Sequence, residues 1–187
     1  MSVAAYPGAA GGYGQKVLLT IIVMTTILAC AMAGRLQTEI KQGKPFTSLE
    51  QEASLNLLRT ADAFLQRMSA VLKPYRLSHS QYNVLRILRG AGASGLACRE
   101  IADRMITRDP DITRLLDRLE RRGLVTRSRE EKDRRVIQAR ITPEGLRILD
   151  GLDEPMNEVD RRQLEHFGEE RLRTFIKLLE LARARGG

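Results

Sequence analysis

The sequence predicts a mainly α-helical fold that carries one small β-hairpin, and three observations lead to this prediction. Apolar residues recur every three or four positions in several segments between residues 47 and 185, as on one face of an α-helix. Only the stretch 124–141 alternates apolar and polar residues in the manner of strands, around a highly charged centre. Gly and Pro residues separate these segments, so we expect short elements joined by turns.

The composition limits the classes of function that the chain can have. The formal net charge of +8 suits a polyanionic partner such as DNA, RNA or an acidic membrane face. Aromatic residues make up only 4% and Trp is absent, which argues against a platform for stacking single-stranded bases. With 2 Cys and 2 His, the chain offers little material for a zinc cluster or a nucleophilic catalytic site. We therefore expect no enzyme activity, no cofactor and no metal ion.

Residues 1–46 form an N-terminal extension whose central segment, 17–33, is apolar and uncharged. Such a segment has about the shortest length that spans a bilayer. Four interpretations stay open: a membrane helix that tethers the protein, a secretory signal with Cys30 in a lipoprotein-like box, a mis-assigned start with Met32 as the true first residue, and an additional soluble helix. The polar lead after Met32 runs directly into the first amphipathic segment, which favours the mis-assigned start.

Two amphipathic helices are predicted next, over 47–72 and about 80–89. The first has an apolar stripe of Leu55, Leu58, Phe64, Leu65, Met68, Val71 and Leu72. Ser48 and the acidic residues after it mark its start, and Pro74 marks its end. The second has Ser78 as its N-cap, and its inward-facing residues are Tyr82, Leu85, Ile87 and Leu88.

A short helix over 99–104 and a longer one over 109–122 are predicted to follow. The first should bury Ile101, Ala102 and Met105. In the second, Asp109 is a natural N-cap and Pro110 a natural first residue, while Gly123 ends the helix. Its apolar stripe is Ile112, Leu115, Leu116 and Leu119, and the opposite face carries Pro110, Arg114, Asp117, Arg118 and Arg121. This pattern suits a helix that reads the DNA major groove, although an ordinary amphipathic surface helix has the same pattern.

The following hairpin favours the DNA-reading interpretation. Residues 124–127 and 136–141 are predicted strands, and the tip between them, 128–135, is almost entirely charged. A helix-turn-helix followed directly by a hairpin with a basic tip is typical of a winged helix-turn-helix. Such a tip can place an arginine in the minor groove while neighbouring groups contact phosphates.

Two further helices close the chain over 143–185. Thr142 and Pro143 begin the first, whose stripe is Leu146, Leu149, Leu152, Met156 and Val159. The last helix follows Phe167 and Gly168 and places Leu172, Phe175, Ile176, Leu179 and Leu181 on one side. These helices are more apolar than a short domain buries by itself, so we expect a second copy of the chain to cover them.

The order of these motifs resembles the MarR family over residues 47–187. The matching stretches are Gln81-Tyr82-Asn83-Val84-Leu85-Arg86, Glu100-Ile101-Ala102, Ile112-Thr113-Arg114-Leu115-Leu116-Asp117-Arg118-Leu119-Glu120, Gly123-Leu124-Val125, Asp133-Arg134-Arg135 and Ile141-Thr142-Pro143-Glu144-Gly145. The resemblance implies a winged helix-turn-helix over 78–142 and dimerisation helices over 47–72 and 143–185. It leaves residues 1–46 unexplained.

The resemblance also implies roles for individual residues. Residues 109–122 become the recognition helix, in which Thr113, Arg114 and Arg118 contact bases or phosphates and Asp117 orients its neighbours. For Arg121 and Arg122 we favour an interaction with the carboxyl end of their own helix.

In the wing, the resemblance assigns the minor-groove contact to Arg135. Asp133 would brace the tip, and Lys132 and Arg134 would contact phosphates. Cys98 lies away from the cysteine of the hydroperoxide-sensing members, so we interpret it as structural.

The predicted function is that of a homodimeric, sequence-specific regulator of transcription. It would bind double-stranded DNA at a pseudo-palindrome in the cytoplasm, as a repressor that a small amphipathic ligand releases. The alternatives are a winged-helix module that binds an acidic protein, and a membrane-tethered form of the regulator in which 17–33 provides the anchor.

Overall fold

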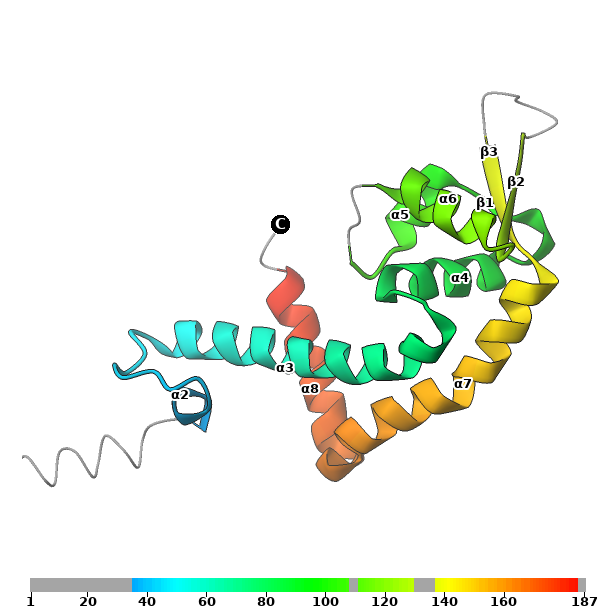
Figure 1. The fold of residues 1–187 in the computed structure, drawn as a ribbon. Helices are drawn as coiled ribbons and strands as arrows, with labels where there is room; N and C mark the ends of the chain where they lie inside the picture. Colours follow the sequence, from blue (N-terminus) through cyan, green and yellow to red (C-terminus); the bar gives the residue numbers. More distant parts are fainter. Residues whose placement is uncertain (1–34, 108–110, 130–136, 185–187) are drawn as a thin grey trace, which may run out of the picture. The chain divides into compact units, whose positions relative to one another are not determined.

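The computed structural model describes residues 35–107, 111–129 and 137–184, and the chain divides into two compact units, 1–60 and 61–187. Figure 1 shows a mostly helical chain with one small sheet. The elements are α2 (Arg35–Glu39), α3 (Leu49–Leu72), η1 (Lys73–Tyr75), α4 (His79–Ala91), η2 (Gly92–Ser94), β1 (Leu96–Ala97), α5 (Cys98–Arg104), α6 (Ile112–Arg121), β2 (Val125–Arg129), β3 (Ile137–Ile141), α7 (Pro143–Leu164), η3 (Glu165–Phe167) and α8 (Gly168–Ala184). The predicted class, mainly α with a small hairpin, is confirmed.

The unit 1–60 contains α2 and the start of α3. Leu36 of α2 is buried. The start of α3 is capped as the sequence predicts, since Ser48 Oγ accepts the Gln51 N–H at 3.2 Å. In turn, Gln51 Oε1 accepts the Thr47 N–H at 2.7 Å. These side chains satisfy N–H groups that a helix start leaves without partners.

The core of the unit 61–187 lies where α4, α5, α6 and the sheet meet. Ser78 caps α4 as predicted, in a reciprocal pair with Gln81. Tyr82, Leu85 and Leu88 are buried as expected, and Val84, which the prediction omitted, is buried too. Ile101 of α5 and Met105, the C-cap of that helix, are buried, but Ala102 is exposed, which contradicts the prediction. A seven-residue helix has room for only a narrow buried stripe, and Ala102 lies outside it.

The hairpin of β2 and β3 is joined by a third strand that the sequence did not predict. β1 pairs antiparallel with β3, so the sheet order is β1-β3-β2. Gly95 leads into β1 with φ +68°, and a Cβ there would lie 2.5 Å from the Ala139 carbonyl oxygen. Glycine is therefore required for the close approach of the two strands.

Helix α7 begins as predicted, with Thr142 as N-cap and Pro143 in the first turn. It continues through Pro155, whose ring nitrogen has no hydrogen for the Gly151 carbonyl. That carbonyl instead accepts the Tyr75 hydroxyl at 3.4 Å. Leu149, Leu152 and Met156 are buried, whereas Leu146, predicted in the same stripe, is 37% exposed.

Helix α8 buries none of its side chains, and Ile176, Leu178 and Leu181 are exposed. No helix among the described residues is long and apolar enough to cross a membrane. The apolar segment 17–33 lies outside those residues.

Candidate nucleic-acid interface

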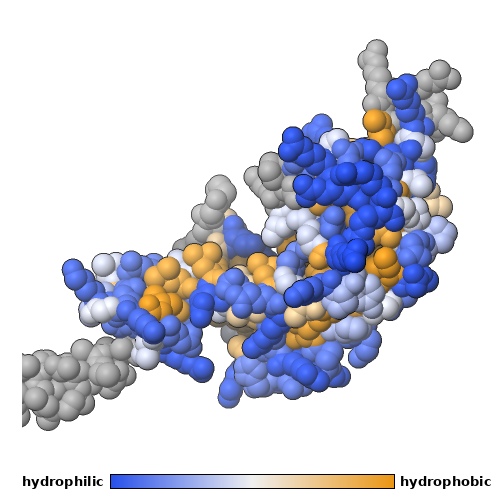
Figure 2. Space-filling model, viewed as in Figure 1, coloured by the Kyte–Doolittle hydropathy of each residue, from blue (hydrophilic) through white to orange (hydrophobic). Residues whose placement is uncertain are grey.

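Helix α6 is fixed by one face and exposes the other. Its four aliphatic residues, Ile112, Leu115, Leu116 and Leu119, are all buried as the sequence predicts. Thr113, Arg114 and Arg118 are exposed, and Asp117 is half-buried. Figure 2 shows that hydrophilic residues dominate the visible surface of this part of the molecule, while hydrophobic residues gather along α3.

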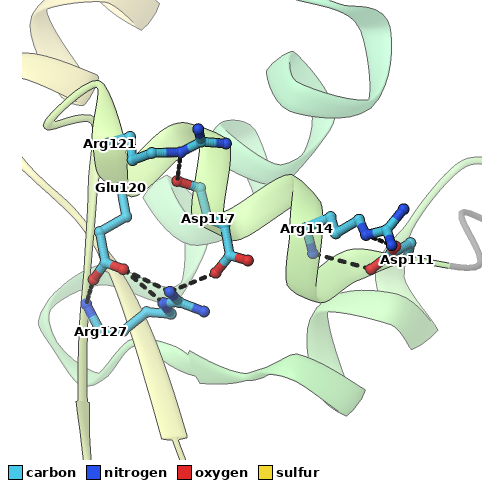
Figure 3. Close-up of polar contacts among 6 residues, drawn as sticks. All are labelled: Asp111, Arg114, Asp117, Glu120, Arg121 and Arg127. Atoms are coloured by element: carbon cyan, nitrogen blue, oxygen red, sulfur yellow. Dashed lines mark hydrogen bonds and ion pairs between the residues drawn. The ribbon is translucent and has the colours of Figure 1, made fainter.

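The start of α6 differs from the prediction. The N-cap is Asp111, whose Oδ1 accepts the Arg114 N–H at 3.0 Å and whose Oδ2 pairs with Arg114 Nε at 3.0 Å (Figure 3). The helix therefore begins at Ile112 rather than at Pro110, and Asp109 and Pro110 lie outside the described residues. The contact with Asp111 holds the exposed Arg114 guanidinium near the amino end of the helix.

Arg127 of β2 ties the hairpin to α6. Its guanidinium lies 2.6 Å from Asp117 Oδ1 and 2.6 Å from Glu120 Oε2, and its backbone N–H donates to Glu120 Oε1 at 3.0 Å (Figure 3). The hydrogen bonds from Arg127 hold the pKa of Glu120 below its ordinary value. The Asp117 carboxylate thus orients a neighbour, in line with the role implied by the resemblance. The sequence interpretation missed Arg127 and Glu120, although opposite charges on either side of the turn at Gly123 could have suggested the pair.

The neighbouring Arg121 and Arg122 donate hydrogen bonds to different parts of the chain. Arg121 Nε donates to the Asp117 carbonyl of its own helix at 3.3 Å, as we expected. Arg122 does not: its guanidinium donates to the carbonyls of Tyr75 and Arg76, each at 2.7 Å. The prediction for Arg122 was wrong because the segment after α3 brings two carbonyls within reach. Arg122 therefore links the carboxyl end of α6 to the segment before α4.

The base of the hairpin is stiffened by Arg140 of β3, which the sequence interpretation also missed. Its guanidinium donates to the Ala93 carbonyl at 2.9 Å, to Ser128 Oγ at 2.6 Å and to Gln138 Oε1 at 2.8 Å. Arg129 and Ile137 are exposed at the far end of the strand pair. The predicted contact residues of the wing tip, Lys132, Asp133, Arg134 and Arg135, lie outside the described residues.

Two contacts fix α5 and the turn after it. Asn83 Oδ1 of α4 accepts the Ile106 N–H at 2.9 Å, and Glu100 Oε2 accepts the Ala97 N–H at 2.9 Å. Ala97 is therefore the N-cap of α5, and Cys98 is the first helical residue. Cys98 packs partly buried against the core. Among the residues the structure describes, no group of three or more His, Cys, Asp or Glu side chains could hold a metal ion.

An ion pair connects the winged-helix unit (residues 78–142) to α7. Arg89 of α4 donates two hydrogen bonds to the Asp153 carboxylate, each of 2.8 Å, and lies 3.6 Å from Asp150. These hydrogen bonds lower the pKa of Asp153 and raise that of Arg89. Together with the Tyr75 contact to Gly151, they attach α7 close to the position of Pro155.

Comparison with known proteins gives a consistent result. The MarR family model matches residues 77–137. The transcriptional repressor IacR of Pseudomonas putida is 30% identical over 125 residues, which cover 67% of this chain and 74% of that protein. The solved MarR transcription factor from Planctomyces limnophilus is 44% identical with a TM-score of 0.57, over 73% of this chain and 98% of that one. CouR from Rhodococcus jostii RHA1, solved with p-coumaroyl-CoA, is 27% identical with a TM-score of 0.62, over 72% and 94%.

Proposed function

The chain belongs to the MarR family of DNA-binding transcription regulators, and from this premise we propose that it is a homodimeric repressor that binds a pseudo-palindromic operator. The observation that carries this proposal is the two-sided character of α6. Four buried aliphatic residues fix its orientation, and the exposed side offers Thr113, Arg114 and Arg118. A helix held in this way can enter the major groove without moving relative to its own core.

We propose separate tasks for the exposed residues of α6. Arg118 has no hydrogen bond or ion pair among the described residues, so its guanidinium is available for guanine or phosphate oxygens. Arg114 shares its guanidinium with Asp111, which fixes its direction and favours a phosphate contact. Asp117 acts through Arg127 and does not itself touch DNA.

For the wing we propose that Arg135 enters the minor groove. Asp133 braces the tip, and Lys132 and Arg134 bind phosphates on either side. Support comes from the rigid base of the hairpin, where Arg127 and Arg140 each join several elements. A hairpin base fixed to α6 in this way suits a wing that reaches the groove beside α6.

The dimer is proposed to form through the helices at the ends of the family-like domain, 47–72 and 143–185. Helix α8 has no buried side chain, and its exposed aliphatic residues need a cover that the described residues do not supply. A second copy related by a two-fold axis places two α6 helices about one DNA turn apart. This spacing predicts an inverted repeat.

A small ligand is proposed to release the DNA, as the related CouR was solved with p-coumaroyl-CoA. The protein works in the cytoplasm, where the genomic DNA is, and regulates without catalysing a reaction. A chain beginning at Met32 should dimerise and bind DNA as the full chain does. Aggregation of that shorter chain would show that residues 1–31 belong to the fold.

The experiment that tests this function is the selection of genomic fragments by the purified full-length protein. We expect an enriched inverted repeat whose half-sites lie about 10 base pairs apart, and an affinity that falls steeply with salt. Arg118→Ala should lower affinity for the selected site by about 10-fold or more, and Arg86→Ala, which changes an exposed arginine on α4 outside the dimerisation helices, should leave it unchanged. Weak binding without sequence preference would contradict the proposal and favour an acidic protein partner.

A further inference from the structure

The hairpin of β2 and β3 has one face that α6 covers only in part. Side chains alternate between the two faces of a strand, so Arg127 and Arg129 of β2 lie on the same face. The register pairs Arg127 with Ala139 and Arg129 with Ile137, which places these two residues of β3 on that face as well. We call it the inner face, because from it Arg127 pairs with two carboxylates of α6 (Figure 3).

The inner face loses its cover toward the far end of the hairpin. Along β2, Val125 is buried, Arg127 is half-buried and Arg129 is exposed. Along β3, Ala139 is fully buried, whereas Ile137 is 45% exposed. The cross-strand pair of Arg129 and Ile137 is therefore open to solvent on the same side of the sheet as the recognition helix.

The two faces of the hairpin also differ in how their polar side chains are paired. On the outer face, the Arg140 guanidinium donates to Ser128 Oγ at 2.6 Å and to Gln138 Oε1 at 2.8 Å. On the inner face, the Arg129 guanidinium has no hydrogen bond or ion pair among the described residues. An available cation beside the exposed aliphatic side chain of Ile137 matches the chemistry of the DNA backbone, in which anionic phosphates alternate with sugars.

We propose that Arg129 and Ile137 bind the sugar-phosphate backbone between the major groove that α6 enters and the adjacent minor groove. The Arg129 guanidinium donates to a phosphate oxygen, and the Ile137 side chain packs against the neighbouring deoxyribose. This contact continues the exposed side of α6, and its positive charge complements the phosphates. It positions the hairpin on the duplex and reads no base. The inference rests on the proposed function, because only a chain that binds DNA can make the contact.

The test compares variants of the full-length protein on the operator obtained by genomic selection. Arg129→Gln should weaken binding by about 5-fold or more, on the selected operator and on an unrelated duplex alike, because a phosphate contact carries no sequence information. It should also lower the slope of log affinity against log salt concentration by about 1 for each chain, which a merely structural role would not do. Arg86→Gln, the same change at an exposed arginine of α4, should alter neither quantity.

A second variant, Ile137→Thr, tests the apolar part of the contact. Threonine keeps the branched Cβ that suits a strand and removes the apolar end of the side chain, so binding should weaken by about 3-fold with the salt slope unchanged. The Tm without DNA should stay close to that of the unsubstituted protein, because Ile137 is largely uncovered in the fold. Thr126→Ala, which changes an exposed residue on the outer face of β2, is the control and should leave the affinity unchanged.

A duplex that carries one uncharged methylphosphonate locates the contact. At the phosphate that Arg129 binds, it should weaken binding of the unsubstituted protein and leave that of Arg129→Gln almost unchanged. The proposal is overturned, and the proposed function stands, if Arg129→Gln keeps the affinity and salt slope while Arg118→Ala weakens binding. It is also overturned if Arg129→Gln weakens dimerisation without DNA, because a second copy then covers the inner face. An unsubstituted protein that selects no duplex contradicts the proposed function and this inference with it.

Discussion

Helices α6 and α8 both repeat aliphatic residues at helical spacing, but those of α6 are buried and several of those of α8 are exposed. All four aliphatic residues of α6 are buried against α4, α5 and the sheet. Helix α8 has no buried side chain, and Ile176, Leu178 and Leu181 are about half exposed, at 48%, 58% and 56%. The difference teaches that the α6 stripe serves the monomer, where it orients the arginines of α6, and we propose that the aliphatic residues of α8 serve association. Substitutions in the two stripes should therefore change different quantities.

The largest effect is expected in α6. Leu119 is fully buried, and Leu119→Ala should lower the free energy of unfolding by about 2–5 kcal/mol, because it removes apolar contacts and leaves a cavity. Urea unfolding at one protein concentration measures this loss. A loss below about 1 kcal/mol would show that the α6 stripe does not anchor the helix.

The next effect concerns α8 and the dimer. Leu178→Ser combined with Leu181→Ser should weaken dimerisation by about 100-fold or more, since each leucine loses its burial in both copies. Sedimentation velocity over a dilution series measures the change. The matched control is Lys177→Ser with Glu180→Ser, which alters two exposed polar residues at the same spacing. Equal behaviour of the two pairs would place the dimer interface elsewhere.

A smaller loss of stability is expected from a substitution where the hairpin joins α6. Arg127→Gln removes the charge that two carboxylates of α6 share, and we expect a loss of about 1–2 kcal/mol in unfolding free energy. Amide hydrogen exchange should also quicken at residue 127, whose N–H donates to Glu120. Arg129→Gln, on the same strand and exposed, is the control. If both variants exchange alike, Arg127 does not hold the hairpin.

The smallest effect is a pH dependence from the link between α4 and α7. Arg89 depresses the pKa of Asp153, so this pair stabilises the fold above the ordinary aspartate pKa, and the stabilisation is lost as the pH falls through the lowered folded pKa. Both side chains are partly exposed, so the contribution is below about 1 kcal/mol. Asp153→Asn should reduce the fall in unfolding free energy that is measured as the pH is lowered from about 5 to 2. Asp150→Asn, whose carboxylate lies farther from Arg89 at 3.6 Å, should change it less.

Features that depend on a few neighbouring residues could be predicted from the sequence. The Ser78 cap, the Thr142 cap and the α6 stripe follow from side-chain chemistry within one or two turns. The sequence pattern predicts the start of α6 two residues early, because Asp109 and Asp111 flank Pro110 and both have the chemistry of an N-cap. The local sequence pattern does not show which of the two aspartates caps the helix.

Features that depend on distant parts of the chain could not be predicted. Strand β1 has only two residues and exists because β3 lies beside it. Helix α7 tolerates Pro155 with the help of Tyr75, far away in the sequence. Within the candidate interface, the exposed Thr113, Arg114 and Arg118 could be named from helical spacing. The roles of Arg122 and Arg127 depend on which carbonyls and carboxylates the fold brings to them.

The most direct test of a dimeric DNA-binding regulator is the stoichiometry of its complex with a selected operator. Sedimentation of the full-length protein with a labelled duplex should give two chains per duplex. A duplex with one half-site scrambled should bind at least about 100-fold more weakly, because one α6 loses its base contacts. One chain per duplex, with an affinity that scrambling leaves unchanged, would contradict the account.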